Sequence, residues 1–127
     1  MVRLLYTHEL KPHEKVVISH ALLLLAEVLW TRTVTTPILV DTKTKTILDG
    51  HHRWWVGKRL GFRRIPAYCV DYLNDDSIGC EPRRKEIPIN KEIIIATAQS
   101  GQIYPPKTTR HIYKLPASVT YPLGDLF

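Results

Sequence analysis

The chain has 127 residues, of which 44% are hydrophobic, and its formal net charge is +6. This length predicts a single domain over residues 1–127, and the apolar content excludes a disordered chain. Cys69 and Cys80 match no zinc or redox spacing and are too few for a disulfide scaffold, as expected in a reducing cytosol. The basic residues favour an anionic partner, although basic clusters more often form an ordinary solvated surface.

The amino-terminal stretch MVRLLYTHELKPHE becomes polar too early for a signal peptide. The apolar run over residues 16–30 is interrupted by Ser19, His20 and Glu27 and is short for a membrane span. We therefore expect a soluble, cytoplasmic protein without a membrane partner.

The first elements in chain order are a strand over residues 2–6, a polar loop containing Pro12 and a helix over residues 15–30. The helix sequence is apolar on almost every side, which predicts burial on most faces. His20 and Glu27 lie seven residues apart and therefore share one helical face, where they form its polar stripe.

Two apolar runs on either side of DTKTK predict a hairpin with strands over residues 37–40 and 46–48. The elements that follow are a helix over 51–60 ended by Gly61, a strand over 65–71, a loop over 74–85, and a helix over 91–100 between Asn90 and Gly101. The proline-rich tail reads as irregular. This pattern predicts an α/β (α+β) fold, a mixed sheet flanked by helices.

The motif DGHHR, residues 49–53, lies between the second hairpin strand and the next helix. Gly50 permits a sharp turn, and the free amides of the first helical turn form an anion site. Arg53 can bind a phosphate in a bidentate way, and Asp49 can hold Mg²⁺ beside it or orient a histidine. An Asp49 helix cap with solvated basic neighbours explains the motif about equally well. A transition-metal site is disfavoured because the adjacent His51 and His52 cannot readily chelate one ion.

Two further segments carry candidate site residues. Glu14 of KPHE is either a general base or an ordinary acid in the first turn of the helix that follows. The segment PPKTTRH carries many hydrogen-bond donors and no acid, which favours binding of an anion or a carboxylate. Its candidate binding residues are Lys107, Thr108, Thr109, Arg110 and His111.

The strand–DGHHR–helix arrangement resembles the ParB/sulfiredoxin-like superfamily of nucleotide-binding domains. KPHE, DGHHR and PKTTRH in this order, with a GxxYxPKTTRH stretch and a final LF, closely resemble the free serine kinases. The resemblance covers most of the chain. It implies a ParB/sulfiredoxin-like fold and phosphorylation of free L-serine to O-phospho-L-serine by a nucleotide with Mg²⁺, feeding cysteine biosynthesis.

The resemblance also implies a role for each motif. Glu14 corresponds to the carboxylate that takes the proton from the serine hydroxyl, and Asp49 to an essential acid near the reacting phosphate and the metal. Gly50, His51, His52 and Arg53 correspond to the phosphate-binding residues. The residues that correspond to the loop holding serine or its phosphorylated product are Lys107, Thr108, Thr109, Arg110 and His111.

The nucleotide donor is less clearly indicated, because free serine kinases include users of ATP and users of ADP. Longer members carry an additional segment between the region of Tyr72–Asp76 and the last helix, where this chain has only the basic connection IGCEPRRKEIPI. We expect ATP rather than ADP, because Arg83, Arg84 and Lys85 suit an additional phosphate. If these three residues simply face solvent, they carry no information about the donor.

Three other functions agree less well with the sequence. A sulfiredoxin-type phosphotransferase needs a cysteine where His51 stands. A ParB-like nucleotide- or DNA-binding module fits the basic surface, but it would usually add a helix-turn-helix domain. A kinase acting on protein serines fits the donor-rich PKTTRH segment less well than a free amino acid does. The sequence does not specify the oligomeric state, the use of threonine or the exact metal ligands.

Overall fold

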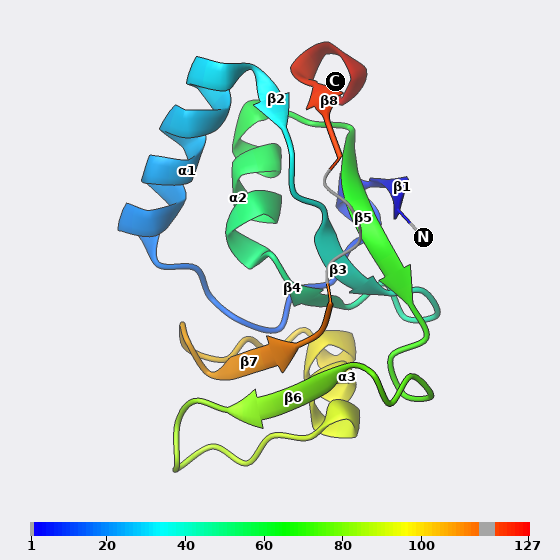
Figure 1. Cartoon of the computed structure of the whole chain (residues 1–127). Coiled ribbons are helices and arrows are strands. Elements are labelled where there is room, and N and C mark those ends of the chain that lie inside the picture. The colour runs from blue at the N-terminus through cyan, green and yellow to red at the C-terminus, as the bar shows by residue number, and fades with distance from the viewer. Residues whose placement is uncertain (1, 115–118) are drawn as a thin grey trace.

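A four-stranded mixed sheet forms the centre of the computed structural model, which describes residues 2–114 and 119–127 (Figure 1). The strand order is β1 (Val2–Tyr6), β5 (Arg64–Val70), β3 (Ile38–Asp41) and β4 (Ile47–Asp49). β5 pairs antiparallel with β1 and parallel with β3, and β3 pairs antiparallel with β4. Every residue of β3 is buried, as expected for a continuous apolar strand inside a sheet. The predicted strands and hairpin are confirmed.

Helix α2 (His51–Leu60) lies against the sheet, and α1 (Ile18–Thr31) lies beside α2 on the side away from the sheet (Figure 1). α2 ends at Gly61, whose left-handed backbone allows its amide to bind the carbonyls at the end of the helix. The third helix, α3 (Lys91–Ser100), begins where the Asn90 side chain accepts a hydrogen bond from an amide of its first turn at 2.7 Å. The predicted bounds of α2 and α3 are therefore confirmed.

A smaller layer of α3 with a two-stranded ribbon lies below the main sheet (Figure 1). The ribbon pairs β6 (Gly79–Pro82) antiparallel with β7 (Thr109–Ile112). The loop predicted over residues 74–85 is therefore wrong for β6, and part of the tail predicted as irregular is β7. The sequence of β6, Gly-Cys-Glu-Pro, has few strand formers, and its partner comes from a distant part of the chain.

Four short elements complete the described structure. They are β2 (Thr33–Val34), β8 (Tyr121–Pro122), and the 3₁₀ turns η1 (Thr7–Glu9) and η2 (Leu123–Asp125). β2 pairs antiparallel with β8, so the segment after α1 lies against the C-terminal residues. The α+β class with a mixed sheet and flanking helices is confirmed.

α1 differs from its prediction in two ways. It begins at Ile18 rather than near residue 15, and it is buried only at Ala21 and Val28. The prediction of burial on most faces is wrong, because α1 packs on α2 from the outside and no other described element covers its far side (Figure 1). Among the described residues, no helix combines the length and the apolar composition needed to cross a membrane.

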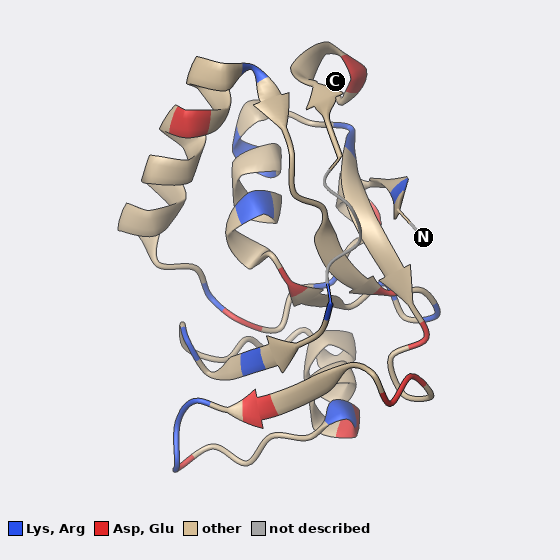
Figure 2. Cartoon of the chain, viewed as in Figure 1, with Lys and Arg blue, Asp and Glu red and all other residues tan. Residues whose placement is uncertain are grey.

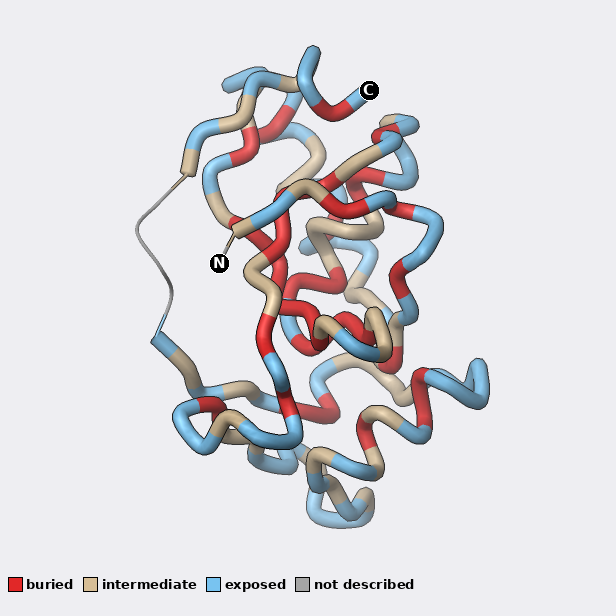
Figure 3. The backbone as a smooth tube through the Cα atoms, turned by 90° about the vertical axis from the view of Figure 1, so that its right-hand side faces the viewer, coloured by how far each residue is buried: buried red, intermediate tan, exposed pale blue. Residues whose placement is uncertain are grey.

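Two apolar clusters fill the two sides of the main sheet. The first includes Leu5, Ile38 and Ile65, with Trp54 of α2 packed against them. The second includes Tyr72 and Ile94 and joins the sheet to α3. Figure 3 shows buried segments running through the middle of the molecule, with exposed segments around them. DGHHR runs from the end of β4 into the first turn of α2, and the second half of PKTTRH lies in β7. The core thus fixes the positions of these two motifs relative to each other.

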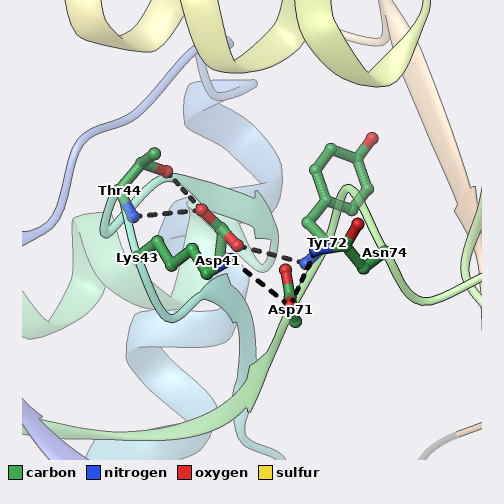
Figure 4. A network of polar contacts seen from close by, with 6 residues as sticks. All are labelled: Asp41, Lys43, Thr44, Asp71, Tyr72 and Asn74. Carbon is green, nitrogen blue, oxygen red and sulfur yellow. Dashed lines mark hydrogen bonds and ion pairs between the residues drawn. The ribbon is translucent and has the colours of Figure 1, made fainter.

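The buried carboxylate of Asp41 connects the hairpin turn to the end of β5 (Figure 4). It accepts hydrogen bonds from the Thr44 amide at 3.0 Å, the Thr44 hydroxyl at 2.6 Å and the Tyr72 amide at 3.1 Å. Beside it, Asp71 forms an exposed ion pair with Lys43. A buried carboxylate with three donors is well satisfied and fixes the position of Tyr72.

Candidate active site

A cavity of about 390 Å³ lies where α1, the start of α2, the end of β4 and β7 meet. The predicted site residues line it with one exception, Thr108. Thr108 is fully buried and its hydroxyl donates to the carbonyl of Pro105 at 2.6 Å. The three motifs KPHE, DGHHR and PKTTRH, far apart in sequence, therefore contribute to a single site.

The amino-terminal end of α2 at this cavity has no side-chain cap. The cap residue is Gly50 with φ +97°, and a Cβ atom there would lie 2.6 Å from Cγ2 of Ile38. Asp49 accepts a hydrogen bond from the amide of Gly50 at 2.9 Å and does not cap the first turn. The alternative in which Asp49 caps the helix is therefore not found. The amides of residues 51–53 have no acceptor within the helix and form a site for an anion.

The two adjacent histidines bind the segment that carries Glu14. Nε2 of His51 accepts a hydrogen bond from the amide of His13 at 3.1 Å, and Nε2 of His52 accepts one from the amide of Val17 at 3.0 Å. Each ring therefore has its proton on Nδ1. Burial lowers the pKa of His51 well below its usual value and also lowers the pKa of His52. Both rings are thus neutral at pH 7 and bring no positive charge to the cavity.

The carboxylate of Glu14 is held by the backbone of the PKTTRH segment. Its Oε1 accepts hydrogen bonds from the amides of Thr108 and Thr109, both at 2.9 Å, and lies 3.0 Å from the Thr109 hydroxyl. Its Oε2 accepts no hydrogen bond from any described residue. Because α1 begins only at Ile18, the alternative of a first-turn acid is not found. One oxygen of Glu14 is fixed, and the other is available to a ligand.

His13 connects this carboxylate to the main sheet, although sequence reasoning did not select it. The ring is fully buried, with Nδ1 2.8 Å from the Ile47 carbonyl and Nε2 3.1 Å from the Thr109 hydroxyl. A carbonyl only accepts, so Nδ1 carries a proton, and burial lowers the pKa of His13, which keeps the ring neutral. The single hydroxyl proton of Thr109 is therefore shared between His13 and Glu14.

Four cationic side chains line the cavity, namely Arg53, Arg83, Lys107 and Arg110. Arg83 was expected, with Arg84 and Lys85, to suit an additional phosphate, and it lines the cavity because β6 pairs with β7. Its neighbour Arg84 instead donates to the carbonyl of Pro106 at 2.7 Å, so these neighbours do not act as one basic group. Figure 2 shows a basic position on β7 and further basic positions in the connection that follows β6. Such a set of cations suits a polyanion.

His111 enters the cavity as a neutral ring. Its Nε2 lies 2.8 Å from the hydroxyl of Tyr72, the residue fixed by Asp41. Burial lowers the pKa of His111 to about 4, so the imidazole is uncharged near neutral pH. His111 can therefore orient a ligand by hydrogen bonding without repelling the neighbouring cations.

Asp49 is exposed, and its carboxylate is oriented by Tyr113, a residue that the sequence did not indicate. The Tyr113 hydroxyl donates to Oδ2 of Asp49 at 2.7 Å. No group of three or more His, Cys, Asp or Glu side chains in the described ranges could hold a metal ion. A single carboxylate is nevertheless a suitable Mg²⁺ ligand when phosphate oxygens and water complete the coordination. Asp49 therefore fits such an ion.

A second, less polar pocket of about 200 Å³ adjoins the cavity and shares Leu24 and Arg53 with it. Val28 of α1, Val56 of α2 and Phe62 contribute apolar walls. Three threonines of the segment after α1, namely Thr33, Thr35 and Thr36, line it as well and supply polar groups. A flat apolar group with hydrogen-bonding edges would suit this pocket.

Comparisons with known proteins agree with the sequence resemblance. The chain is 41% identical over 67 residues to a ParB-like protein of Sulfolobus acidocaldarius, a match that covers 53% of the chain and 33% of the relative. It is 35% identical over 77 residues to an ATP-dependent L-serine kinase of Desulfurococcus mucosus, covering 58% of the chain and 30% of the relative. An ADP-dependent L-serine kinase of Thermococcus kodakarensis is 32% identical over 72 residues, covering 54% and 30%. No family model matches the chain.

The matches span about a third of the length of these curated relatives. A solved structure described as a free serine kinase in complex with AMP superposes with a TM-score of 0.89 over 99% of this chain and 93% of its own, at 17% identity. At this identity the superposition establishes the common fold. The resemblance to free serine kinases and ParB-like proteins, and the fold that it implied, are thereby confirmed.

Proposed function

We propose that this protein phosphorylates free L-serine to O-phospho-L-serine with a nucleotide as phosphoryl donor. The observation that carries the proposal is Glu14, with one oxygen bound by two backbone amides and the other free, in the same cavity as the uncapped start of α2. A positioned base and a preorganised phosphate site are the two requirements of phosphoryl transfer to a hydroxyl. The relatives named L-serine kinases support this assignment.

The nucleotide phosphates bind at the start of α2, where the free amides of residues 51–53 and Arg53 offer donors. The base enters the adjoining apolar pocket, because Leu24 and Arg53 line both spaces. Thr33 and Thr35, which also line this pocket, offer hydrogen-bonding groups to the polar edge of the base. Asp49, with phosphate oxygens, would hold Mg²⁺, which supplies neutralisation of the phosphate charge.

Serine binds beside Glu14 and the donor-rich PKTTRH segment. Its carboxylate pairs with the cations Lys107 and Arg110, which line the same cavity as Glu14. Its hydroxyl oxygen attacks the terminal phosphorus, and the proton passes to Oε2 of Glu14. The bond from that phosphorus to the bridging oxygen breaks, and its electron pair leaves with the shortened nucleotide. Arg53 and Arg83 stabilise the charge on the transferring group.

Both ATP and ADP fit this arrangement, and we propose ATP as the donor. Arg83 adds a charge to the cavity that suits the extra phosphate, whereas Arg84 is occupied by the Pro106 carbonyl. Chromatography of the spent nucleotide tests the choice, with donors freed of contaminating ADP or ATP. Formation of ADP in step with phosphoserine supports ATP, and formation of AMP without turnover on pure ATP would reverse it.

The central experiment incubates the protein with L-serine, Mg²⁺ and either nucleotide, and follows phosphoserine by phosphorus NMR. The expected result is a phosphoserine signal that depends on both serine and nucleotide. Nucleotide turnover without phosphoserine would contradict the proposal. The product would feed a reaction that displaces the phosphate from phosphoserine, such as a step of cysteine biosynthesis.

A second candidate is a ParB-like nucleotide- or DNA-binding module, which the net charge of +6 and the ParB-like relative favour. A DNA binder would show an affinity that falls steeply with salt concentration. Titration of labelled duplex at two salt concentrations, with serine turnover measured in parallel, distinguishes the two functions. Tight salt-dependent binding without phosphoserine formation would favour this second candidate.

A further inference from the structure

α1 has a second apolar face that no described residue covers. Its large exposed side chains include Leu23, which is 72% exposed, and Trp30, which is 89% exposed. Three more are about half exposed, namely Ile18, Leu22 and Leu29. At 100° per residue these five positions fall within an arc of roughly 140° around the helix. An apolar stripe of this width is typical of a helix face that packs against protein.

The opposite face of the same helix is already used. Ala21 and Val28 are buried, and Leu24 and Leu25 pack against the cluster that includes Val56 of α2. The second face is therefore not needed for the packing of a single chain. A helix that is apolar on both faces is expected to be buried on both.

The size of this face is near what a small interface requires. A large aromatic side chain carries about 150–250 Å² of surface, so Trp30 and the four aliphatic side chains together expose on the order of 500 Å². This is at the upper end of the largest apolar patches on monomers. Two such faces packed together would bury about 1,000 Å², and their rim would bring the total towards the usual interface size of about 1,200–2,000 Å².

The distribution of charge favours a second copy of this chain as the partner. The molecule is basic overall, so most of its surface repels another copy. α1 contains one charged residue, Glu27 (Figure 2). Glu27 lines the apolar pocket and lies outside the arc of exposed apolar side chains. Two copies can meet here without bringing like charges together. Nucleic acid or an anionic membrane would need cations that the face does not have.

We propose that this face of α1 forms the interface of a symmetric homodimer. A two-fold axis places the same face of both copies together, so Leu23 and Trp30, the two most exposed side chains of this face, lie in the interface. The pocket residues Leu24 and Val28 lie on the other side of the helix and stay within their own subunit.

Light scattering after size-exclusion chromatography tests the proposal on the purified chain. The expected mass is twice 14.7 kDa for the wild type and 14.7 kDa for Leu23→Glu and Trp30→Glu, with unchanged circular dichroism. Leu73→Glu is the matched control, because Leu73 is a 47% exposed leucine on another surface, and this variant should remain a dimer. The measurement is made at ~100 μM protein, because a weak contact of about 5–6 kcal/mol has a Kd of roughly this value. A wild type that is monomeric at this concentration would overturn the proposal. A dimer unaffected by both α1 substitutions would overturn it as well.

A cross-link provides a measurement that does not depend on disrupting the interface. Ser19 lies within the same arc of α1, so Ser19→Cys should form a disulfide-linked dimer on mild oxidation. Ser77→Cys, at an exposed turn elsewhere, and the wild type, with Cys69 and Cys80, serve as controls. Equal cross-linking in all three proteins, or none in Ser19→Cys, would contradict a dimer through α1.

Discussion

The substitution Glu14→Gln separates two roles of this side chain, the anchoring of the PKTTRH segment and the acceptance of a proton. The amide oxygen of glutamine can take the place of Oε1 and accept the amides of Thr108 and Thr109. The reverse orientation would place an NH₂ group against two N–H donors, so the side chain is fixed with its nitrogen at the position of Oε2. That nitrogen cannot take a proton from a serine hydroxyl.

We therefore expect Glu14→Gln to reduce the rate of phosphoserine formation by ~10²–10⁴-fold, which corresponds to about 3–5 kcal/mol in the barrier. Thermal stability and nucleotide affinity should stay close to wild type. Glu14→Ala should also lower stability, because the amides of Thr108 and Thr109, both buried, lose their acceptor. A buried donor without an acceptor costs about 1–3 kcal/mol.

The assay combines single-turnover formation of phosphoserine at saturating serine with thermal unfolding followed by circular dichroism. Isothermal titration of nucleotide provides the control that the phosphate site is intact. Turnover of Glu14→Gln near the wild-type rate would refute the role of Glu14 as a base and leave it as an anchor of the loop. A loss of stability equal to that of the alanine variant would refute the hydrogen-bond argument.

Three other predictions follow from the geometry of the site. Gly50→Ala should lower the free energy of unfolding by about 2–5 kcal/mol in a denaturant titration, because φ is +97° and Ile38 blocks a Cβ atom; an unchanged midpoint would contradict the strained turn. Because burial lowers the pKa of His111 to about 4, the unfolded chain binds a proton at His111 at a higher pH than the folded chain does. The free energy of unfolding should therefore fall by ~3 kcal/mol as the pH drops from about 6.5 to about 4, and His111→Gln should flatten that slope; equal slopes would argue against it. Tyr113→Phe removes the donor to Asp49 and should raise the Mg²⁺ concentration needed for half-maximal turnover by ~10–100-fold, with little change in melting temperature. An unchanged Mg²⁺ titration would count against the orientation of Asp49 by Tyr113.

The main sheet and the bounds of α2 and α3 were predictable because their signals are local. The apolar run of β3, the cap at Asn90 and the terminating Gly61 each act within a few residues. β6 was missed because its strand conformation depends on pairing with β7, and Gly-Cys-Glu-Pro has little preference of its own. The exposed face of α1 could not be foreseen, since apolar periodicity does not say whether a partner comes from the same chain.

The membership of the site was predictable from motifs, but the contacts inside it were not. DGHHR indicated an anion site, whereas the two rings turned out to accept hydrogen bonds from the amides of His13 and Val17. Such side chain to backbone contacts depend on which loop lies above the helix. Tyr113 was not selected, because its partner Asp49 is brought near only by tertiary structure. Arg83 was expected to act together with Arg84 and Lys85, but Arg84 binds the Pro106 carbonyl while Arg83 lines the cavity.

The bond between Glu14 and the Thr108 amide spans 94 positions of the chain, which has a consequence for how the protein becomes active during synthesis. The start of α2 can form early, because β3, β4 and α2 are close in sequence. The carboxylate of Glu14 acquires its backbone donors only after residues 108 and 109 have left the ribosome and β7 has paired with β6. Contacts of such high sequence separation form late because closing the long loop must precede them. For the phosphoryl transfer proposed above, a nascent chain can thus fold the turn proposed to bind phosphate well before the proposed base is in place.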